Sequence, residues 1–269
     1  MNSIVFIGGG NMASAIIGGL IKSGYDALSV LVVDPGDEQR HKLRADFGVR
    51  TLAAADPSLA AATIVVWAVK PQLFQAAAAP CVAHVVGALH LSVMAGIRSD
   101  AIVAATGTQR VVRAMPNTPA LIGQGIAGLF ARAAVEPQQK SQVETLLAPT
   151  GRTLWVQREE DLDAVTALSG SGPAYVFYFV EAMMQAAQEM GLSAEQGKQL
   201  ALATFGGATS LALASSDPPE LLRERVTSKG GTTHAALSSL EDSGVKAAFI
   251  KALKAAQQRA RELGDEFGA

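Results

Sequence analysis

Hydrophobic positions in the first 160 or so residues of the chain form short runs that glycine, proline or charged residues end. Runs that are apolar at consecutive positions are typical of strands buried on both faces of a parallel sheet, with helices covering each side. The patterns between them, with apolar residues three or four apart, predict those helices. The strands we predict are residues 4–7, 28–33, 49–52, 64–69, 89–94, 110–115, 126–130 and 153–156.

The pattern changes near residue 158, after which we find no strand but long apolar helical stretches. The helix from about Pro173 to Met190 is apolar almost all round, and a second helix is predicted from Ala194 to Leu213. Such a helix must be enclosed on every side, and about 110 residues are few to bury it within one chain. Burial in a dimer interface is the favoured solution, and a monomeric helical core is the alternative. We therefore predict two domains: residues 1–158 form an α/β Rossmann-type dinucleotide-binding domain, and residues 159–269 an all-α substrate-binding and dimerisation domain.

The turn between the first strand and the first helix carries a dinucleotide-binding pattern. Gly8, Gly10 and Ala13 match G-x-G-x-x-G/A, in which glycine allows the tight turn and the close approach of a pyrophosphate. The N-terminus of the following helix offers unpaired N–H groups to phosphate. An ordinary strand-to-helix turn is the alternative. The position after a strand and before a helix favours a cofactor site made by Ile7, Gly8, Gly9, Gly10, Asn11, Met12 and Ala13.

Asp34 follows the second predicted strand, where an acidic residue can accept the ribose hydroxyls of NAD and repel a 2′-phosphate. Taken alone, it favours NADH. Four basic residues on the next helix could offset that repulsion if any of them turned back, although a solvated helix face is the simpler interpretation: Arg40, His41, Lys42 and Arg44. The cofactor is therefore NADPH or NADH, with the preference open.

Two further turns lie at predicted carboxyl ends of strands, where open α/β sheets bind ligands. The first contains Ala68, Val69, Lys70 and Pro71, and its lysine could meet a phosphate or the nicotinamide ribose. The second contains Asn117, whose side chain can both donate and accept, as the nicotinamide carboxamide requires. A surface lysine and an ordinary loop are the alternatives.

The second half contains two glycine-rich stretches. We expect residues 168–175 to form a break between helices that packs against another backbone, with Pro173 at the first helical position. Ser169 stands where the G-x-S-x-G nucleophile elbow needs glycine, which excludes that motif.

The other stretch covers residues 226–234. Gly230 and Gly231 allow successive N–H groups to point at one small anion, and Thr232 or Thr233 could cap the next helix. This is chemistry suited to a carboxylate rather than a nucleotide. An ordinary helix-cap loop is the alternative. His234 could act as an acid, but a lone histidine at the start of a helix is more often a neighbour of the cap.

Composition limits the functional classes. The net charge is −2 and 17% of the 269 residues are charged, so neither nucleic acid nor an anionic membrane surface is an expected partner. Cys81 is the only cysteine, so we expect no intrachain disulfide, and no spacing of histidines or acidic residues suggests a metal. The chain has neither a signal-peptide pattern nor an apolar run long enough to span a bilayer, and we expect a soluble cytoplasmic protein.

Five motifs in this order resemble pyrroline-5-carboxylate reductases, and the resemblance covers essentially the whole chain. They are residues 7–12, 68–71, 115–119, 168–175 and 226–233. The resemblance implies NAD(P)H-dependent reduction of 1-pyrroline-5-carboxylate to L-proline, the last step of proline biosynthesis. It also implies helical domains that interlock into homodimers, which in many members join as decamers.

The resemblance also implies roles for individual residues. The glycine turn and residues 68–71 would contact the cofactor, and Asn117 would lie beside the nicotinamide. The substrate carboxylate would sit on Val226, Ser228, Gly230, Gly231, Thr232 and Thr233, with the Thr233 hydroxyl near the ring nitrogen as the catalytic candidate. Two residues depart from the family: Lys229 replaces a common proline, and Asp34 replaces the small or basic residues suited to a 2′-phosphate.

Two other functions remain open on sequence grounds. A β-hydroxyacid dehydrogenase shares this domain order, but it needs a lysine acid/base, and Lys198 lacks the glycine and asparagine context of that family. A non-enzymatic nucleotide-binding protein would not need residues 228–233. Hydride attack on a protonated C=N bond needs alignment more than a strong base, so the lack of a convincing catalytic histidine or carboxylate favours an imine reductase.

Overall fold

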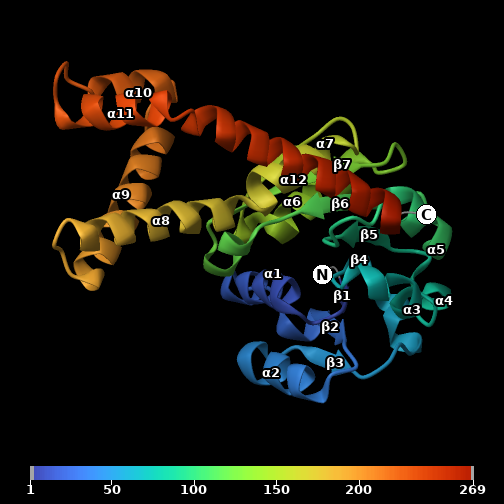
Figure 1. Cartoon of the computed structure of the whole chain (residues 1–269). Coiled ribbons are helices and arrows are strands. Elements are labelled where there is room, and N and C mark those ends of the chain that lie inside the picture. Colours follow the sequence, from blue (N-terminus) through green and yellow to red (C-terminus); the bar gives the residue numbers. More distant parts are fainter. Residues whose placement is uncertain (1–2, 268–269) are drawn as a thin grey trace. The chain divides into compact units, whose positions relative to one another are not determined.

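The computed structural model describes residues 3–267, and its first half is built on one eight-stranded sheet (Figure 1). The strand order is β3-β2-β1-β4-β5-β6-β7-β8, whose first six strands follow the order of dinucleotide-binding Rossmann domains. The strands are β1 (Ile4–Ile7), β2 (Val30–Val33), β3 (Arg50–Leu52), β4 (Ile64–Trp67), β5 (Leu89–Ser92), β6 (Val111–Met115), β7 (Gly125–Ala131) and β8 (Gly151–Trp155). All eight predicted strands are thus confirmed, with ends that differ by a few residues.

The sheet is not wholly parallel, which corrects one expectation. β7 runs antiparallel to β6, whereas every other neighbouring pair is parallel. Only the short 3-10 turn Thr118–Ile122 and its flanks join β6 to β7, and a connection without a crossover helix can join only antiparallel neighbours.

Helices cover both faces of the sheet because successive strand residues alternate between two cores. Ile4 and Phe6 pack with α1 (Asn11–Lys22), α2 (Asp37–Phe47) and α6 (Pro137–Leu147). Val5 and Ile7 pack on the other face with α3 (Phe74–Ala78), α4 (Val82–Val85) and α5 (Ser99–Thr106). Pro80 separates α3 from α4, because proline cannot continue the helical hydrogen-bond ladder.

Two small differences sharpen the predicted strands. The second strand begins at Val30 rather than Leu28, because the Asp26 side chain accepts the Leu28 N–H at 3.0 Å and starts a 3-10 turn. Gly48 ends α2 with φ +69°, a left-handed conformation that glycine adopts without strain.

The chain divides into two compact units. Residues up to Ser171, together with those from Ala256 onward, form the first unit, and Gly172–Ala255 forms the second. The second is entirely helical and contains α8 (Gly172–Glu189), α9 (Ala194–Ala214), α10 (Pro219–Arg225), α11 (Thr232–Asp242) and the first part of α12 (Val245–Phe267). This confirms an α/β domain followed by helices, while the predicted boundary at residues 158 and 159 stays a prediction.

The stretch from residue 168 is not the break between helices that we expected. After α7 (Asp161–Val165) the chain continues as a π-helical turn over Thr166–Gly170, closed by Ser171 N–H donating to the Thr166 carbonyl at 2.8 Å. The hydroxyls of Thr166 and Ser169 donate to carbonyls one turn back and so support this wider turn. α8 begins at Gly172, which makes Pro173 its second residue rather than its first.

Among the residues that the structure describes, no helix is both long enough and apolar enough to cross a membrane.

Candidate functional site

Gly8 makes the sharp turn at the end of β1. Its φ is +94°, and a Cβ there would lie 2.7 Å from the carbonyl oxygen of Ala68 and 2.9 Å from Val69 Cγ1. Gly8 also donates its N–H to the Val33 carbonyl at 2.8 Å. The backbone of this turn therefore approaches the loop after β4 so closely that only glycine is accommodated.

Gly10 differs from Gly8 in that nothing in the chain requires it. Its φ of −65° suits any residue, and a Cβ there would meet no protein atom within 4 Å. Gly10 is the N-cap of α1, which has neither a side-chain cap nor an acidic residue in its first turn. The space beside Gly10 is therefore a cradle in front of uncompensated N–H groups, as a dinucleotide pyrophosphate needs.

Asp34 joins the glycine turn to the end of β2. Its Oδ2 accepts the Gly9 N–H at 2.8 Å, and its Oδ1 accepts the Gly36 N–H at 2.8 Å. Two backbone donors thus hold the carboxylate in a fixed orientation, and Asp34 lines the large cavity described below. Each carboxylate oxygen can accept further hydrogen bonds, so ribose hydroxyls can still be bound there.

Of the four basic residues on α2 considered above, Arg40 does turn back. Its Nη1 donates to the Asp34 carbonyl at 2.8 Å and its Nη2 to Asp37 Oδ1 at 2.8 Å, and only 13% of its side chain is exposed. His41 instead lies near Asp37 on the exposed surface. Arg40 is therefore paired within the protein and not presented to a phosphate.

A cavity of about 680 Å³ lies at the carboxyl ends of β1 to β4. Seven predicted cofactor residues line it: Ile7, Gly8, Gly10, Asp34, Ala68, Val69 and Lys70. Gly9, Asn11, Met12, Ala13 and Pro71 do not line it, and their roles stay predictions. Ala13 is fully buried, as a small residue between helix and sheet must be.

Sequence reasoning missed one wall of this cavity. Ala53, Ala54 and Ala55 follow β3, and Leu73, Ala76, Ala77, Pro80 and Cys81 follow β4. The rule that ligands bind beyond carboxyl ends of strands could have found the three alanines, because Leu52 ends a predicted strand. Cys81 is buried, and burial raises the pKa of its thiol to about 11.

Asn117 is outside that cavity and already bonded within the protein. Its Nδ2 donates to the Ser169 carbonyl at 3.1 Å, and its Oδ1 accepts the Ile126 N–H at 3.0 Å. The Ser169 carbonyl is free for this bond because the residue four positions on, Pro173, has no N–H. One N–H and one lone pair of the amide remain, so a contact with nicotinamide stays a prediction.

In the second unit, the predicted carboxylate loop leads into α11. Gly231 is the N-cap, without a side-chain cap, which corrects the expectation that Thr232 or Thr233 caps this helix. Both threonines lie in the first helical turn instead, because Gly231 N–H donates to the Ser228 carbonyl at 3.0 Å and Gly230 turns with φ +76°. The N–H groups at the start of α11 therefore have no side-chain partner.

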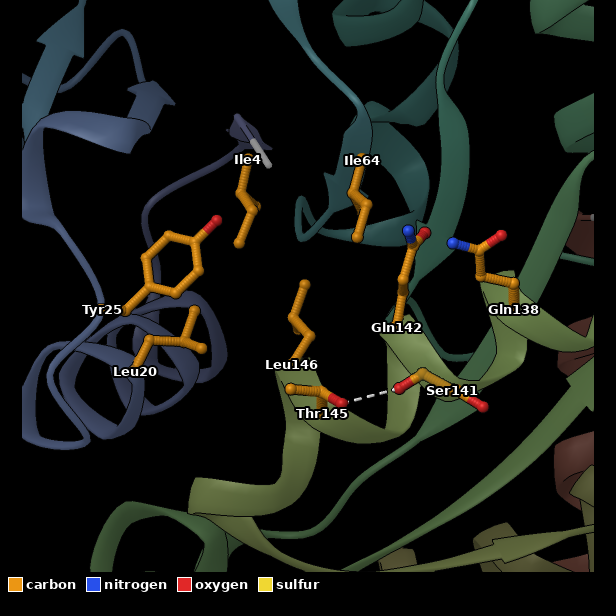
Figure 2. A pocket seen from close by; sticks show the side chains of 9 residues that line it. All are labelled: Ile4, Leu20, Tyr25, Ile64, Gln138, Ser141, Gln142, Thr145 and Leu146. Atoms are coloured by element: carbon orange, nitrogen blue, oxygen red, sulfur yellow. Dashed lines mark hydrogen bonds between the residues drawn. The ribbon is translucent and has the colours of Figure 1, made fainter. Parts of the chain in front are cut away.

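A second hollow of the first unit has a volume of about 250 Å³. Figure 2 shows side chains from α6, α1 and two strands that line it. Ile4 and Ile64 line it, and they are the first residues of β1 and β4. The hollow therefore lies at the amino ends of the strands, opposite the edge at which α/β sheets bind nucleotides.

Comparison with known proteins covers both halves of the chain. A family model described as "Pyrroline-5-carboxylate reductase dimerisation" matches residues 159–263, and one described as "NADP oxidoreductase coenzyme F420-dependent" matches residues 3–96. A solved pyrroline-5-carboxylate reductase from Coxiella burnetii has a TM-score of 0.90 and 37% identity, covering 97% of this chain and 98% of that chain. A pyrroline carboxylate reductase from Plasmodium falciparum, solved with NADP bound, has a TM-score of 0.87 and 27% identity, covering 98% of each.

A pyrroline-5-carboxylate reductase from Pseudomonas aeruginosa is 44% identical over 269 residues, which is 98% of each chain. Similarity at this level over the full length confirms the family that the five motifs predicted: the chain belongs to the pyrroline-5-carboxylate reductases.

Proposed function

We propose that this protein reduces 1-pyrroline-5-carboxylate to L-proline with hydride from NADPH or NADH. The observation that carries the proposal is the open cradle at Gly10, in front of the uncapped N-terminus of α1, in a chain of this family. Neither a β-hydroxyacid dehydrogenase nor a non-enzymatic binding protein is favoured by the relatives. A cytoplasmic location is part of the proposal, because the reaction consumes the nicotinamide cofactors of cellular metabolism.

The chemistry assigns a different task to each group of residues. When bound, the nicotinamide would supply the hydride that adds to the carbon of the protonated C=N bond, and the proton already on the ring nitrogen leaves that nitrogen as a secondary amine. The glycine turn and Asp34 hold the dinucleotide, and the N–H groups at the start of α11 hold the substrate carboxylate. The Thr233 hydroxyl accepts a hydrogen bond from the protonated ring nitrogen and, together with the carboxylate contact, holds the ring in place. Alignment of donor and acceptor is the main contribution of the protein.

The direct test is a pair of assays on the wild-type protein. We expect oxidation of NADPH or NADH, followed by the absorbance of the reduced cofactor, only after 1-pyrroline-5-carboxylate is added. Proline should be the product. A 3-hydroxyacid offered with NAD⁺ or NADP⁺ should give no reaction. Binding of the cofactor without turnover of the imine would contradict the proposal and favour a nucleotide-binding protein.

Thr233→Ala is expected to lower kcat/KM for pyrroline-5-carboxylate by about ten- to a hundredfold, the effect of losing one positioned hydrogen bond in a transition state. The Kd of NADPH or NADH, measured by fluorescence without substrate, should stay unchanged. Ser238→Ala, on an exposed later turn of α11, is the matched control and should keep wild-type kinetics. A weaker cofactor affinity with normal substrate kinetics would contradict the role given to Thr233.

We also propose that NADH is the preferred cofactor. The Asp34 carboxylate lines the cavity and is held by two N–H donors, and Arg40, which turns back onto the Asp34 carbonyl, is already paired with Asp37. A 2′-phosphate beside Asp34 would therefore meet a negative charge that Arg40 is not free to offset. Asp34→Ser should change the ratio of kcat/KM values toward NADPH by tenfold or more, about 1.4 kcal/mol. An unchanged ratio in the paired cofactor assay would show that Asp34 does not select the cofactor.

The protein is proposed to act as a homodimer formed by its helical half. Large apolar side chains of α8 and α9 are exposed in the single chain, with Phe177 58%, Tyr178 69% and Leu213 67% exposed. Such a surface is typical of a protein interface rather than of a solvated one. The family model that matches residues 159–263 is named for dimerisation, which supports burial of this surface against a second copy. Assembly of the dimers into decamers stays a prediction.

A further inference from the structure

The first unit contains a cluster of charged side chains that the proposed chemistry does not use. Its centre is Arg98, in the loop before α5, which donates two hydrogen bonds to Asp163 of α7. Nη1 lies 3.1 Å from Oδ1, and Nη2 lies 2.9 Å from Oδ2. The two side chains are only 18% and 7% exposed. A mostly buried, bidentate pair fixes both partners in orientation as well as distance.

Glu159, four residues before Asp163, binds the same loop. Its Oε1 accepts the Ser99 N–H at 2.6 Å and its Oε2 accepts the Ser99 hydroxyl at 2.5 Å. Arg98, the N-cap of α5, provides no side-chain cap, so Glu159 caps this helix from a distant part of the chain. Arg113 of β6 donates to Glu159 Oε1 at 2.8 Å and ties the contact to the sheet. The segment that precedes the helical unit is thus fixed at two points.

The last turns of α12, which belong to the first unit, contact the same arginine. A Cβ on Gly264 of α12 would lie 2.5 Å from Arg98 Nη2 and 2.7 Å from its Cζ. The α12 backbone therefore lies directly against the guanidinium group, and Gly264 is buried there. In the loop just before Arg98, a Cβ on Gly96 would lie 3.2 Å from the Leu263 carbonyl oxygen of α12. Small residues on both sides allow this close contact.

We propose that Arg98 is a positioning residue for the reduction, an inference that rests on the proposed function. The chain passes from the first unit to the second after Ser171 and returns at Ala256. We call these two points the crossings. Arg98 contacts Asp163, shortly before the first crossing, and Gly264, shortly after the second. α12 is continuous from Val245 to Phe267, so the helix that Arg98 contacts belongs to both units. Arg98 acts on catalysis by holding the two chain segments that lead into and out of the unit that carries the substrate-carboxylate loop.

The expected result for Arg98→Ala is a loss of at least tenfold in kcat/KM for pyrroline-5-carboxylate, carried by both a higher KM and a lower kcat. The Kd of NADH or NADPH without substrate should stay within twofold of the wild-type value, because the glycine turn and Asp34 do not contact this cluster. Arg98→Lys keeps the charge but loses the planar, bidentate geometry of the guanidinium, and it should recover part of the lost activity.

Gly264→Ala provides a second variant that cannot act by weakening α12, since alanine favours a helix more than glycine does. The added methyl group would displace the Arg98 guanidinium. Gly264→Ala should therefore show the same fall in kcat/KM as Arg98→Ala. Asp100→Asn is the matched control, because Asp100 pairs with Arg132 in the same cluster but is 83% exposed and contacts neither crossing. It should keep wild-type kinetics.

Three outcomes would overturn the inference. Folded Arg98→Ala and Gly264→Ala proteins with kcat and KM within twofold of wild type would remove the positioning role alone. An equal loss of cofactor affinity would show general damage to the first unit instead. Absence of turnover by the wild-type and Asp100→Asn proteins would overturn the proposed function, and this inference with it.

Discussion

Replacing Gly10 with alanine is expected to raise the Kd of NADPH and NADH at least tenfold, about 1.4 kcal/mol, without unfolding the protein. The protein itself gives the added methyl group no obstacle, because φ is −65° and no heavy atom of the chain lies within 4 Å of the Cβ position. Exchanging glycine for alanine at an N-cap should lower the free energy of unfolding by less than about 1 kcal/mol. A large loss of affinity can then come only from a ligand that occupies the cradle.

Gly8→Ala is the matched comparison, since it adds the same methyl group two residues away. There φ is +94° and the new Cβ would lie 2.7 Å from the Ala68 carbonyl oxygen, so we expect a loss of about 2–4 kcal/mol in the free energy of unfolding. Urea denaturation measures that loss, and fluorescence titration measures cofactor affinity. A stable Gly8→Ala protein, or a Gly10→Ala protein with wild-type affinity, would contradict the division of roles between the two glycines.

Most of the sheet could be predicted because each buried strand has a run of apolar residues that can be recognised within the strand itself. Ile64 to Trp67 is apolar at every position since both faces are covered, and Pro80 interrupts a helix wherever the fold places it. The direction of β7 could not be predicted, because a strand has the same pattern of apolar residues whichever way it runs. The π-helical turn after Val165 was missed because Gly170, Gly172 and Pro173 are equally typical of a loop.

The meeting of Gly8 and Asp34 at one cavity was predictable for a similar reason, and the limits of that prediction are physical too. Gly8 and Asp34 follow strand ends in sequence, so their meeting at one edge follows from strand order alone. By contrast, Ala53, Ala54 and Ala55 have no polar group that marks them as cavity residues. Arg98 could not be recognised at all, because its partners Asp163 and Gly264 are distant in sequence and the contact exists only after folding.

His90 is expected to make the stability of the protein depend on pH in the mildly acidic range. It is fully buried on β5, where its Nδ1 accepts the Trp67 indole N–H at 2.9 Å and its Nε2 lies 3.1 Å from the Val85 carbonyl oxygen. Both ring nitrogens are thus used by the neutral form with the proton on Nε2. Desolvation by burial, helped by the charge of Arg110, lowers the pKa of His90 to about 4.

The unfolded chain, in which a histidine has a pKa of about 6.5, therefore binds more protons than the native state between pH 6.5 and pH 4. The free energy of unfolding must fall as the pH falls through this range, by about 2 kcal/mol from pH 7 to pH 5, and His90 adds nothing further below pH 4. Urea denaturation at a series of pH values measures the slope. His90→Gln keeps an acceptor for Trp67 and a donor for Val85 and should flatten the slope. Equal slopes in the wild-type and His90→Gln proteins would show that His90 is not the group that titrates.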